Sequence, residues 1–341
     1  MKKLLNTLYV QTQGIYLRRE GETVVAEKDG KTLMRLPVHT LSGLVTFGNV
    51  MCSPFLLHLC AERGIAVSFL SEHGRFLARV TGPVSGNVHL RVAQMRAFED
   101  PATKGAIARS CVAGKVANDR AILLRRMRDH GETPALRDAS AHLADILARL
   151  RTSPPDAARI RGLEGEGAAA YFAAFNDLLL ANRAAFSIEN RNRRPPTDPL
   201  NALLSFLYTL LAHDCRGACE AVGLDPQIGF LHELRSGRPS LALDLMEEFR
   251  APLADRLVLT LVNRQQIVPK DFKTTESGAV LLADDARKDV LLAWQQRKLE
   301  TVNHPFLGES VPIGLLPYVQ ALLLARHLRG DLDAYPPWMP K

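Results

Sequence analysis

The stretch Gly82-Pro83-Val84-Ser85-Gly86 separates two kinds of sequence pattern. Before it, short apolar runs alternate with turn residues, and Asp29-Gly30 between two such runs is a strong β-hairpin signal. After Asn87 the apolar residues recur at helical spacing. Because glycine and proline favour neither a helix interior nor a central strand, the stretch predicts a boundary between a mostly β region and a helical one.

Two domains are expected on either side of this boundary, since 341 residues exceed the usual size of a single domain. We expect an α+β chain with a small, mostly β domain at residues 1–82, a linker at 83–87 and a larger, all-α domain at 88–341. From about residue 331 the chain combines a tyrosine, a tryptophan and three prolines. That composition predicts a flexible, extended tail, either disordered or docked on a partner.

Composition narrows the class of protein. The sequence has no run of about 18 apolar residues and no signal peptide, so we expect a cytoplasmic protein without a membrane anchor. Its five cysteines are scattered and lack C-x-x-C spacing, which favours reduced thiols. The net charge is +7, and the excess of basic residues lies in the first half of the chain. A basic half beside a neutral half is typical of proteins that bind a polyanion.

Residues 230–250 combine a histidine with four acidic residues. The turn residues 236–239 end one segment, and Ser240 is a good N-cap for a following helix. On that helix Asp244, Glu247 and Glu248 share one edge, with His232 just upstream across the turn. One imidazole and several carboxylates suit Mg²⁺ or Mn²⁺. The alternative is a surface helix with a solvated acidic edge.

A second carboxylate stands in the stretch 162–172, Gly-Leu-Glu-Gly-Glu-Gly-Ala-Ala-Ala-Tyr-Phe. Its small residues permit close approach of another backbone. Glu164 shares a helix face with Tyr171, whereas Glu166 points elsewhere. A carboxylate on the small-residue face would be desolvated and would need a cation or donors, although a glutamate that favours the helix dipole is an equal interpretation.

Residues 191–201, Arg-Asn-Arg-Arg-Pro-Pro-Thr-Asp-Pro-Leu-Asn, form a basic loop whose prolines limit helix formation on both sides. Arg191, Arg193 and Arg194 on such a stiff loop suit backbone phosphates.

Taken together, these stretches, with Gly-Leu-Asp-Pro-Gln-Ile-Gly-Phe-Leu-His at 223–232 and Leu-Ala-Leu-Asp-Leu-Met-Glu-Glu-Phe-Arg at 241–250, resemble the CRISPR-associated adaptation integrases of the Cas-one family. The resemblance extends over nearly the whole chain. It implies an N-terminal β-sandwich-like domain, a short linker and a C-terminal helical catalytic domain. It also implies a homodimeric, metal-dependent DNA endonuclease. With a small dimeric partner, the Cas-two protein, such an enzyme inserts short double-stranded DNA segments at the leader-repeat end of a CRISPR array.

The family's metal-binding Glu, His and Asp fall on Glu164, His232 and Asp244, and Glu247 stands where an additional carboxylate can assist. The expected ion is Mg²⁺ or Mn²⁺. We further expect Tyr171 and Asn201 near this site and DNA phosphates on five arginines: Arg191, Arg193, Arg194, Arg235 and Arg238.

Residue chemistry leaves two other functions open. A metal-dependent nuclease that acts on branched or repair intermediates would share the site without performing integration. A non-catalytic nucleic-acid scaffold would carry the acidic residues only as surface.

Overall fold

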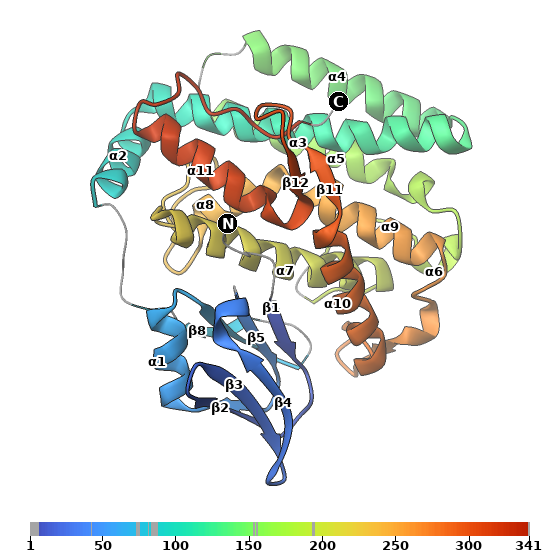
Figure 1. Ribbon diagram of the computed structural model, residues 1–341. Helices are drawn as coiled ribbons and strands as arrows, with labels where there is room; N and C mark the ends of the chain where they lie inside the picture. The colour runs from blue at the N-terminus through green and yellow to red at the C-terminus, as the bar shows by residue number, and fades with distance from the viewer. Residues whose placement is uncertain are drawn as a thin grey trace. The chain divides into compact units, whose positions relative to one another are not determined.

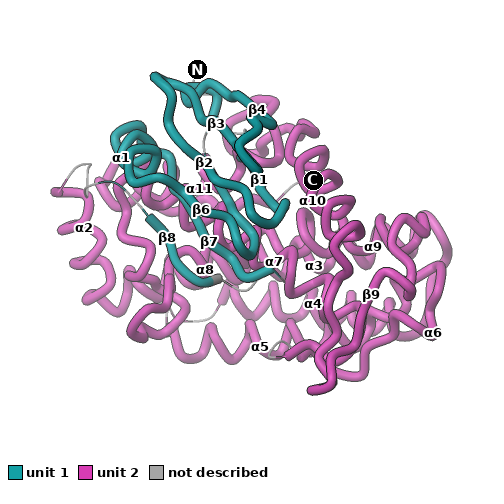
Figure 2. Tube along the Cα trace, turned by 90° about the horizontal axis from the view of Figure 1, so that it is seen from below, with its two compact units in different colours: residues 1–86 teal, residues 87–341 magenta. Residues whose placement is uncertain are grey.

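The computed structural model describes residues 7–41, 43–72, 76–80, 82, 88–152, 154, 156–192 and 195–339. The chain divides into two compact units, Met1–Gly86 and Asn87–Lys341, which Figure 2 colours separately. The predicted linker at 83–87 lies outside the described residues. No described helix is long and apolar enough to cross a membrane.

The N-terminal unit contains two four-stranded sheets. One has the order β1-β5-β7-β8 and the other β4-β3-β2-β6. Asp29 and Gly30 connect β3 to β4 with φ angles of 51° and 73°, as expected for a two-residue hairpin turn. The strands are β1 (Thr7–Val10), β2 (Ile15–Glu20), β3 (Thr23–Lys28), β4 (Lys31–Pro37), β5 (Gly43–Phe47), β6 (Val50–Cys52), β7 (Ala66–Leu70) and β8 (Phe76–Val80).

One core joins both sheets and the single long helix of this unit, α1 (Pro54–Glu62). It combines Leu17 and Val24 of one sheet with Leu44 and Val67 of the other, and α1 adds Leu56. All five side chains are buried because alternate residues of each strand face this core. Two packed sheets around one apolar core agree with the sandwich-like expectation.

The C-terminal unit is mainly helical (Figure 1). Its longest helix, α3, packs against α2, α4, α5 and α8, and α7 packs against α8 and α11. The helices are α2 (Val88–Glu99), α3 (Pro101–His130), α4 (Pro134–Thr152), α5 (Ala157–Ala173), α6 (Arg183–Phe186), α7 (Pro199–Val222), α8 (Ser240–Glu247), α9 (Arg256–Asn263), α10 (Asp284–Leu299) and α11 (Leu316–Leu328), with a π-helical segment η3 (Arg250–Asp255) before α9.

Two expectations for this unit were wrong. It is not all-α, because β9 (Phe272–Thr274) pairs with β10 (Val280–Leu282), and β11 (Thr301–Asn303) pairs with β12 (Ser310–Pro312). The final segment is not a flexible tail, because Tyr335 and Trp338 are each only 2% exposed within the same unit. Burying these large aromatic side chains in the core of the same unit is more favourable in free energy than leaving them exposed to solvent.

Candidate metal and DNA site

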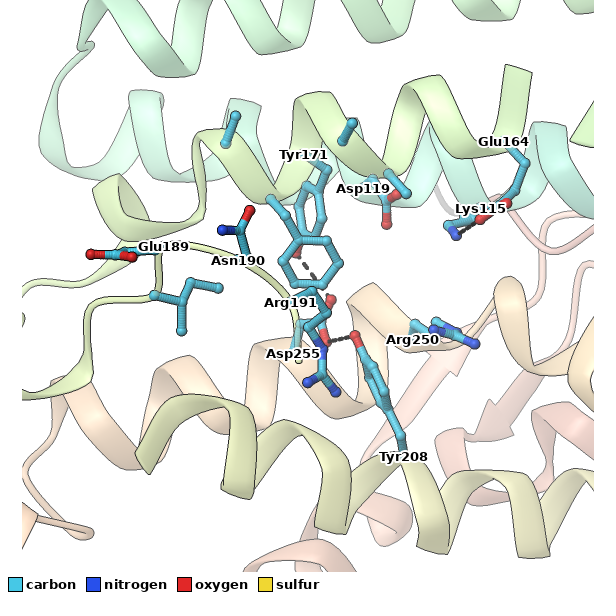
Figure 3. Close-up of a pocket in the computed structure, with 15 residues that line it drawn as sticks. Lys115, Asp119, Glu164, Tyr171, Glu189, Asn190, Arg191, Tyr208, Arg250 and Asp255 are labelled. Atoms are coloured by element: carbon cyan, nitrogen blue, oxygen red, sulfur yellow. Dashed lines mark hydrogen bonds and ion pairs between the residues drawn. The ribbon is translucent and has the colours of Figure 1, made fainter. Parts of the chain in front are cut away.

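Glu164 projects from α5 toward α3, where its carboxylate forms an ion pair with the Lys115 ammonium (Figure 3). The lysine side chain is 7% exposed and that of Glu164 is 26% exposed. A Cβ at Gly167 of α5 would meet Val116 of α3 at 3.4 Å and Ile146 of α4 at 3.5 Å, ordinary van der Waals contact, so the packing here does not require glycine. Glu166 instead pairs with exposed Arg149, at 2.8 Å, which agrees with the choice of Glu164 as the site carboxylate.

The turn before α8 is held by Asp244, which is fully buried. Its carboxylate accepts hydrogen bonds from the backbone amides of Phe230, Leu231 (3.0 Å) and His232 (2.9 Å). Its Oδ1 also lies 2.7 Å from Nδ1 of His232. A carboxylate at Nδ1 fixes the proton there and leaves Nε2 as the free ring nitrogen. Asp244 therefore orients the imidazole.

The local sequence explains this turn. Gly229 is required because a Cβ there would lie 2.6 Å from the carbonyl carbon of Ser240 and 2.7 Å from Asp244 Oδ2. Ser240 is the first residue of α8 and its hydroxyl donates to the Glu233 carbonyl at 3.0 Å, so the expected N-cap role was wrong by one position. The turn brings His232 and Asp244 together, as the sequence predicted.

Glu247 lies one turn farther along α8 and is 2% exposed. Its Oε2 is 2.8 Å from Lys115 Nζ, and its Oε1 is 2.8 Å from Arg250 Nη2 and 3.9 Å from His232 Nε2. Burial alone would raise the pKa of Glu247, but Arg250 and Lys115 outweigh it and lower the pKa below its usual value. The side chain is thus a buried, ionised carboxylate.

Beside these residues lies a pocket of about 440 Å³, lined by Lys115, Glu164, Tyr171, Tyr208 and Asp255 among others. Figure 3 shows Asp255 between the two tyrosines, both of which donate to it, Tyr208 at 2.7 Å and Tyr171 at 3.2 Å. Burial raises the pKa of Asp255 to about 6, and these hydrogen bonds partly oppose the shift. Tyr171 therefore lines the pocket as expected, but its hydroxyl is already bonded to Asp255.

The predicted DNA contacts occupy different environments. The Arg191 guanidinium is bonded within its own loop and to Ser205 Oγ at 3.2 Å, and Asn201 is fully buried and absent from the pocket lining. Arg235 is exposed and Arg238 is half-buried, both on the turn before α8. Arg193 and Arg194 lie outside the described residues.

The chemical types of the available donors suit a divalent cation. Glu164 and Glu247 both contact the Lys115 ammonium, and His232 Nε2 lies 3.9 Å from Glu247 Oε1. Oxygen and nitrogen ligands of this type suit Mg²⁺ or Mn²⁺. Glu247 Oε2 accepts no hydrogen bond among the described residues, although it lies beside the lysine ammonium. Within the described ranges no three such side chains stand at ligand distance from a common point, since Lys115 separates the two carboxylates.

Sequence reasoning missed the internal cations. Lys115 is buried and Arg250 is half-buried, and both contact Glu247, although neither is among the site residues expected from the sequence. The available signal was the neighbourhood of Lys115 on α3, where Gly114, Val116 and Asn118 are small, apolar or amide residues and point to a buried face.

Comparison with known proteins gives one consistent family. The family model described as CRISPR associated protein Cas1 matches residues 8–296. A Rhodospirillum rubrum protein named CRISPR-associated endonuclease Cas1 2 is 56% identical over 347 residues, covering all of both chains. A Chlorobaculum tepidum protein named CRISPR-associated endonuclease Cas1 1 is 53% identical over 342 residues, covering 99% of each chain.

Solved structures share the fold. A CAS1 protein from Thermotoga maritima has a TM-score of 0.83 at 24% identity, covering 97% of this chain and 99% of that one. A casposase bound to an integration product has a TM-score of 0.82 at 22% identity, covering 97% and 93%. A Cas6-RT-Cas1–Cas2 complex has a TM-score of 0.84 at 22% identity, and the match covers 98% of this chain and 36% of that one.

Proposed function

Because this chain belongs to the CRISPR-associated Cas1 family, we propose that it is a metal-dependent DNA endonuclease and integrase that inserts short DNA segments into a CRISPR array. The carrying observation is that Glu164 and Glu247 meet at the Lys115 ammonium, with His232 Nε2 3.9 Å from Glu247 Oε1. The names of the relatives support endonuclease activity. A casposase bound to an integration product has a similar fold, which supports the integrase part of the proposal.

Mg²⁺ or Mn²⁺ would be held by Glu164, Glu247 and Nε2 of His232. This assignment exchanges the roles predicted for Asp244 and Glu247. Asp244 is supported as a positioning residue because both of its oxygens already accept hydrogen bonds from the turn. Glu247 is supported as a ligand because its carboxylate faces cations, with Oε2 2.8 Å from the Lys115 ammonium that a metal ion would displace.

The bound cation would neutralise charge on the phosphodiester and lower the pKa of the attacking hydroxyl. Residues of this chain position the proposed ligands. Asp244 holds the imidazole in one tautomer, and Arg250, 2.8 Å from Glu247, keeps that carboxylate ionised and in place. Water would be the nucleophile in cleavage, and the 3′ hydroxyl of the incoming DNA would be the nucleophile in integration.

The proposed partners are double-stranded DNA, as the incoming segment and as the leader-repeat, a second copy of this chain and the small dimeric Cas2 protein. The relative solved as a Cas1–Cas2 complex supports the last of these. Arg235 and Arg238, on the turn that carries His232, are the described arginines best placed for DNA phosphates. The proposed location is the cytoplasm, where such a DNA substrate would be met.

A strand-transfer assay tests the proposal. A short duplex with free 3′ hydroxyls is incubated with a supercoiled plasmid carrying a leader and repeat, with Mg²⁺, Mn²⁺ or EDTA, with and without the small partner. We expect joined product only with a divalent ion, and none from His232→Ala. Cleavage without joining would favour a repair nuclease instead, and activity in EDTA or in His232→Ala would refute the site.

A further inference from the structure

The Lys115 ammonium stands where the proposed metal ion would bind. It contacts the carboxylates of Glu164 and Glu247, 2.8 Å from Oε2 of the latter, on a side chain that is 7% exposed. A divalent cation held by the same two carboxylates would be within a few ångströms of this ammonium. Like charges at such a distance repel strongly away from bulk water. Lysine and metal therefore cannot share the position.

A second acceptor for the lysine lies on the same helix. Asp119 is one turn beyond Lys115 on α3, so the two side chains are neighbours on one helix face. It is 2% exposed, and its Oδ2 is buried without a hydrogen-bond partner among the described residues. Both residues line the pocket, where Figure 3 shows Asp119 beside the lysine. A buried carboxylate oxygen without a partner is unfavourable unless a donor or cation can reach it.

We propose that Lys115 is a resident counter-cation of the metal site, which occupies the point between Glu164 and Glu247 in the metal-free protein and moves to Asp119 when a divalent cation binds. This inference rests on the proposed function. The flexible four-carbon side chain of lysine allows the movement while its Cα stays on α3. The open space of the pocket, about 440 Å³, provides room for it.

The proposed role has two consequences, and the second distinguishes it from a fixed structural ion pair. First, Lys115 neutralises the buried carboxylates without metal, so the site folds without an ion but binds it against an internal competitor. Second, Asp119 contributes to metal affinity although it is not proposed as a ligand, because it receives the displaced ammonium. A lysine fixed in the ion pair would also repel the metal, but it would give Asp119 no role in metal affinity.

Calorimetric titration with Mn²⁺ alone tests both consequences on the full chain. Removing the competitor in Lys115→Met should lower the Kd for Mn²⁺ about tenfold, ~1.4 kcal/mol, and should lower the melting temperature of the metal-free protein. Asp119→Asn should raise the Kd about tenfold, because the displaced ammonium loses its acceptor, without lowering the metal-free melting temperature. Lys104→Met removes a lysine of the same helix that lies over the Phe98 ring, and should leave the Kd unchanged.

An equal or higher Kd in Lys115→Met would overturn the inference, as would an unchanged Kd in Asp119→Asn. If Lys115→Met did not fold, the Asp119→Asn titration would decide alone. Wild-type protein that binds no Mn²⁺ would refute the proposed metal-dependent function together with this inference. Wild-type binding with no effect of either substitution would refute the counter-cation role alone.

Discussion

Glu247 and Glu248 are consecutive, chemically identical and both buried, yet the structure places them in opposite environments. Glu247 faces Lys115 and Arg250, and these cations lower its pKa. Glu248 faces neutral groups from the end of the chain, and burial raises its pKa to about 8 although those hydrogen bonds oppose the shift. The sign of the neighbouring charge therefore decides which buried carboxylate stays ionised.

The environment of Glu248 is built by the final segment. Its carboxylate accepts hydrogen bonds from the Tyr335 hydroxyl, the Trp338 backbone amide at 2.7 Å and Gln320 Nε2 at 3.0 Å. Gly114 on α3 permits this approach, since a Cβ there would lie 3.0 Å from Glu248 Cγ and 3.1 Å from Pro337 Cβ. Glu247 is thus suited to a cation, whereas Glu248 joins α8 to the end of the chain.

The largest expected difference concerns activity. Glu247→Gln should lower divalent-ion-dependent strand transfer about 10³-fold, ~4 kcal/mol in barrier height, because it removes a charged ligand. Glu248→Gln should stay within about tenfold of wild type, since a neutral side chain already suits that environment. Initial rates of product joining at saturating Mn²⁺ measure both. Equal losses of activity in the two variants would contradict the different roles of Glu247 and Glu248.

Stability should depend on the Glu248 side of the pair, where the end of the chain packs. Trp338→Ala should lower the free energy of unfolding by about 3–5 kcal/mol, because it removes a large buried side chain packed against Phe249. Met339→Ala, next in sequence but 39% exposed, is the matched control and should stay within about 0.5 kcal/mol. Urea denaturation followed by far-UV circular dichroism gives both values. A small effect of Trp338→Ala would mean that the end of the chain does not hold α8.

A substitution of Asp244 tests whether this residue orients the His232 ring without binding the metal itself. Asp244→Asn should weaken Mn²⁺ binding about 10- to 100-fold, because the His232 ring loses the carboxylate that fixes its tautomer. Calorimetric titration gives the affinity, and the pH dependence of binding should also shift, which a purely structural defect would not cause. Complete loss of binding in a folded variant would instead restore Asp244 as a ligand.

The smallest expected effect concerns Asp255, a third buried carboxylate, whose donors are two tyrosine hydroxyls. Its pKa is raised to about 6, so the folded state holds the proton more tightly than the unfolded state. The resulting stabilisation is present at low pH and is lost as the pH rises through about 6. The stability of Asp255→Asn relative to wild type should therefore rise by roughly 1 kcal/mol between pH 5 and pH 7. Denaturation at both pH values measures it, and a constant difference would contradict the raised pKa.

Local patterns in the sequence predicted much of the fold. The predicted Asp29-Gly30 hairpin is confirmed, and local chemistry likewise explains the helix that starts at Pro54 after a Ser53 cap. These features depend on residues within a few positions of each other. The turn that joins His232 to Asp244 also follows from local chemistry, because glycine and proline interrupt the helix there. The sequence also predicts a short strand at residues 278–282, where β10 lies, but strands of three residues carry too little periodicity to specify the pairs β9–β10 and β11–β12.

The sequence by itself determined which residue types are available for the site: a histidine beside a turn, carboxylates at helical spacing and a glutamate on a helix of small residues. Only the tertiary structure decided their roles. It gave the hydrogen bonds of Asp244 to the turn, brought Lys115 of α3 between Glu164 and Glu247, and packed the end of the chain onto Glu248. These assignments depend on which charges and donors meet across distant helices, and burial greatly strengthens such contacts, whereas helical spacing specifies only the face of each helix.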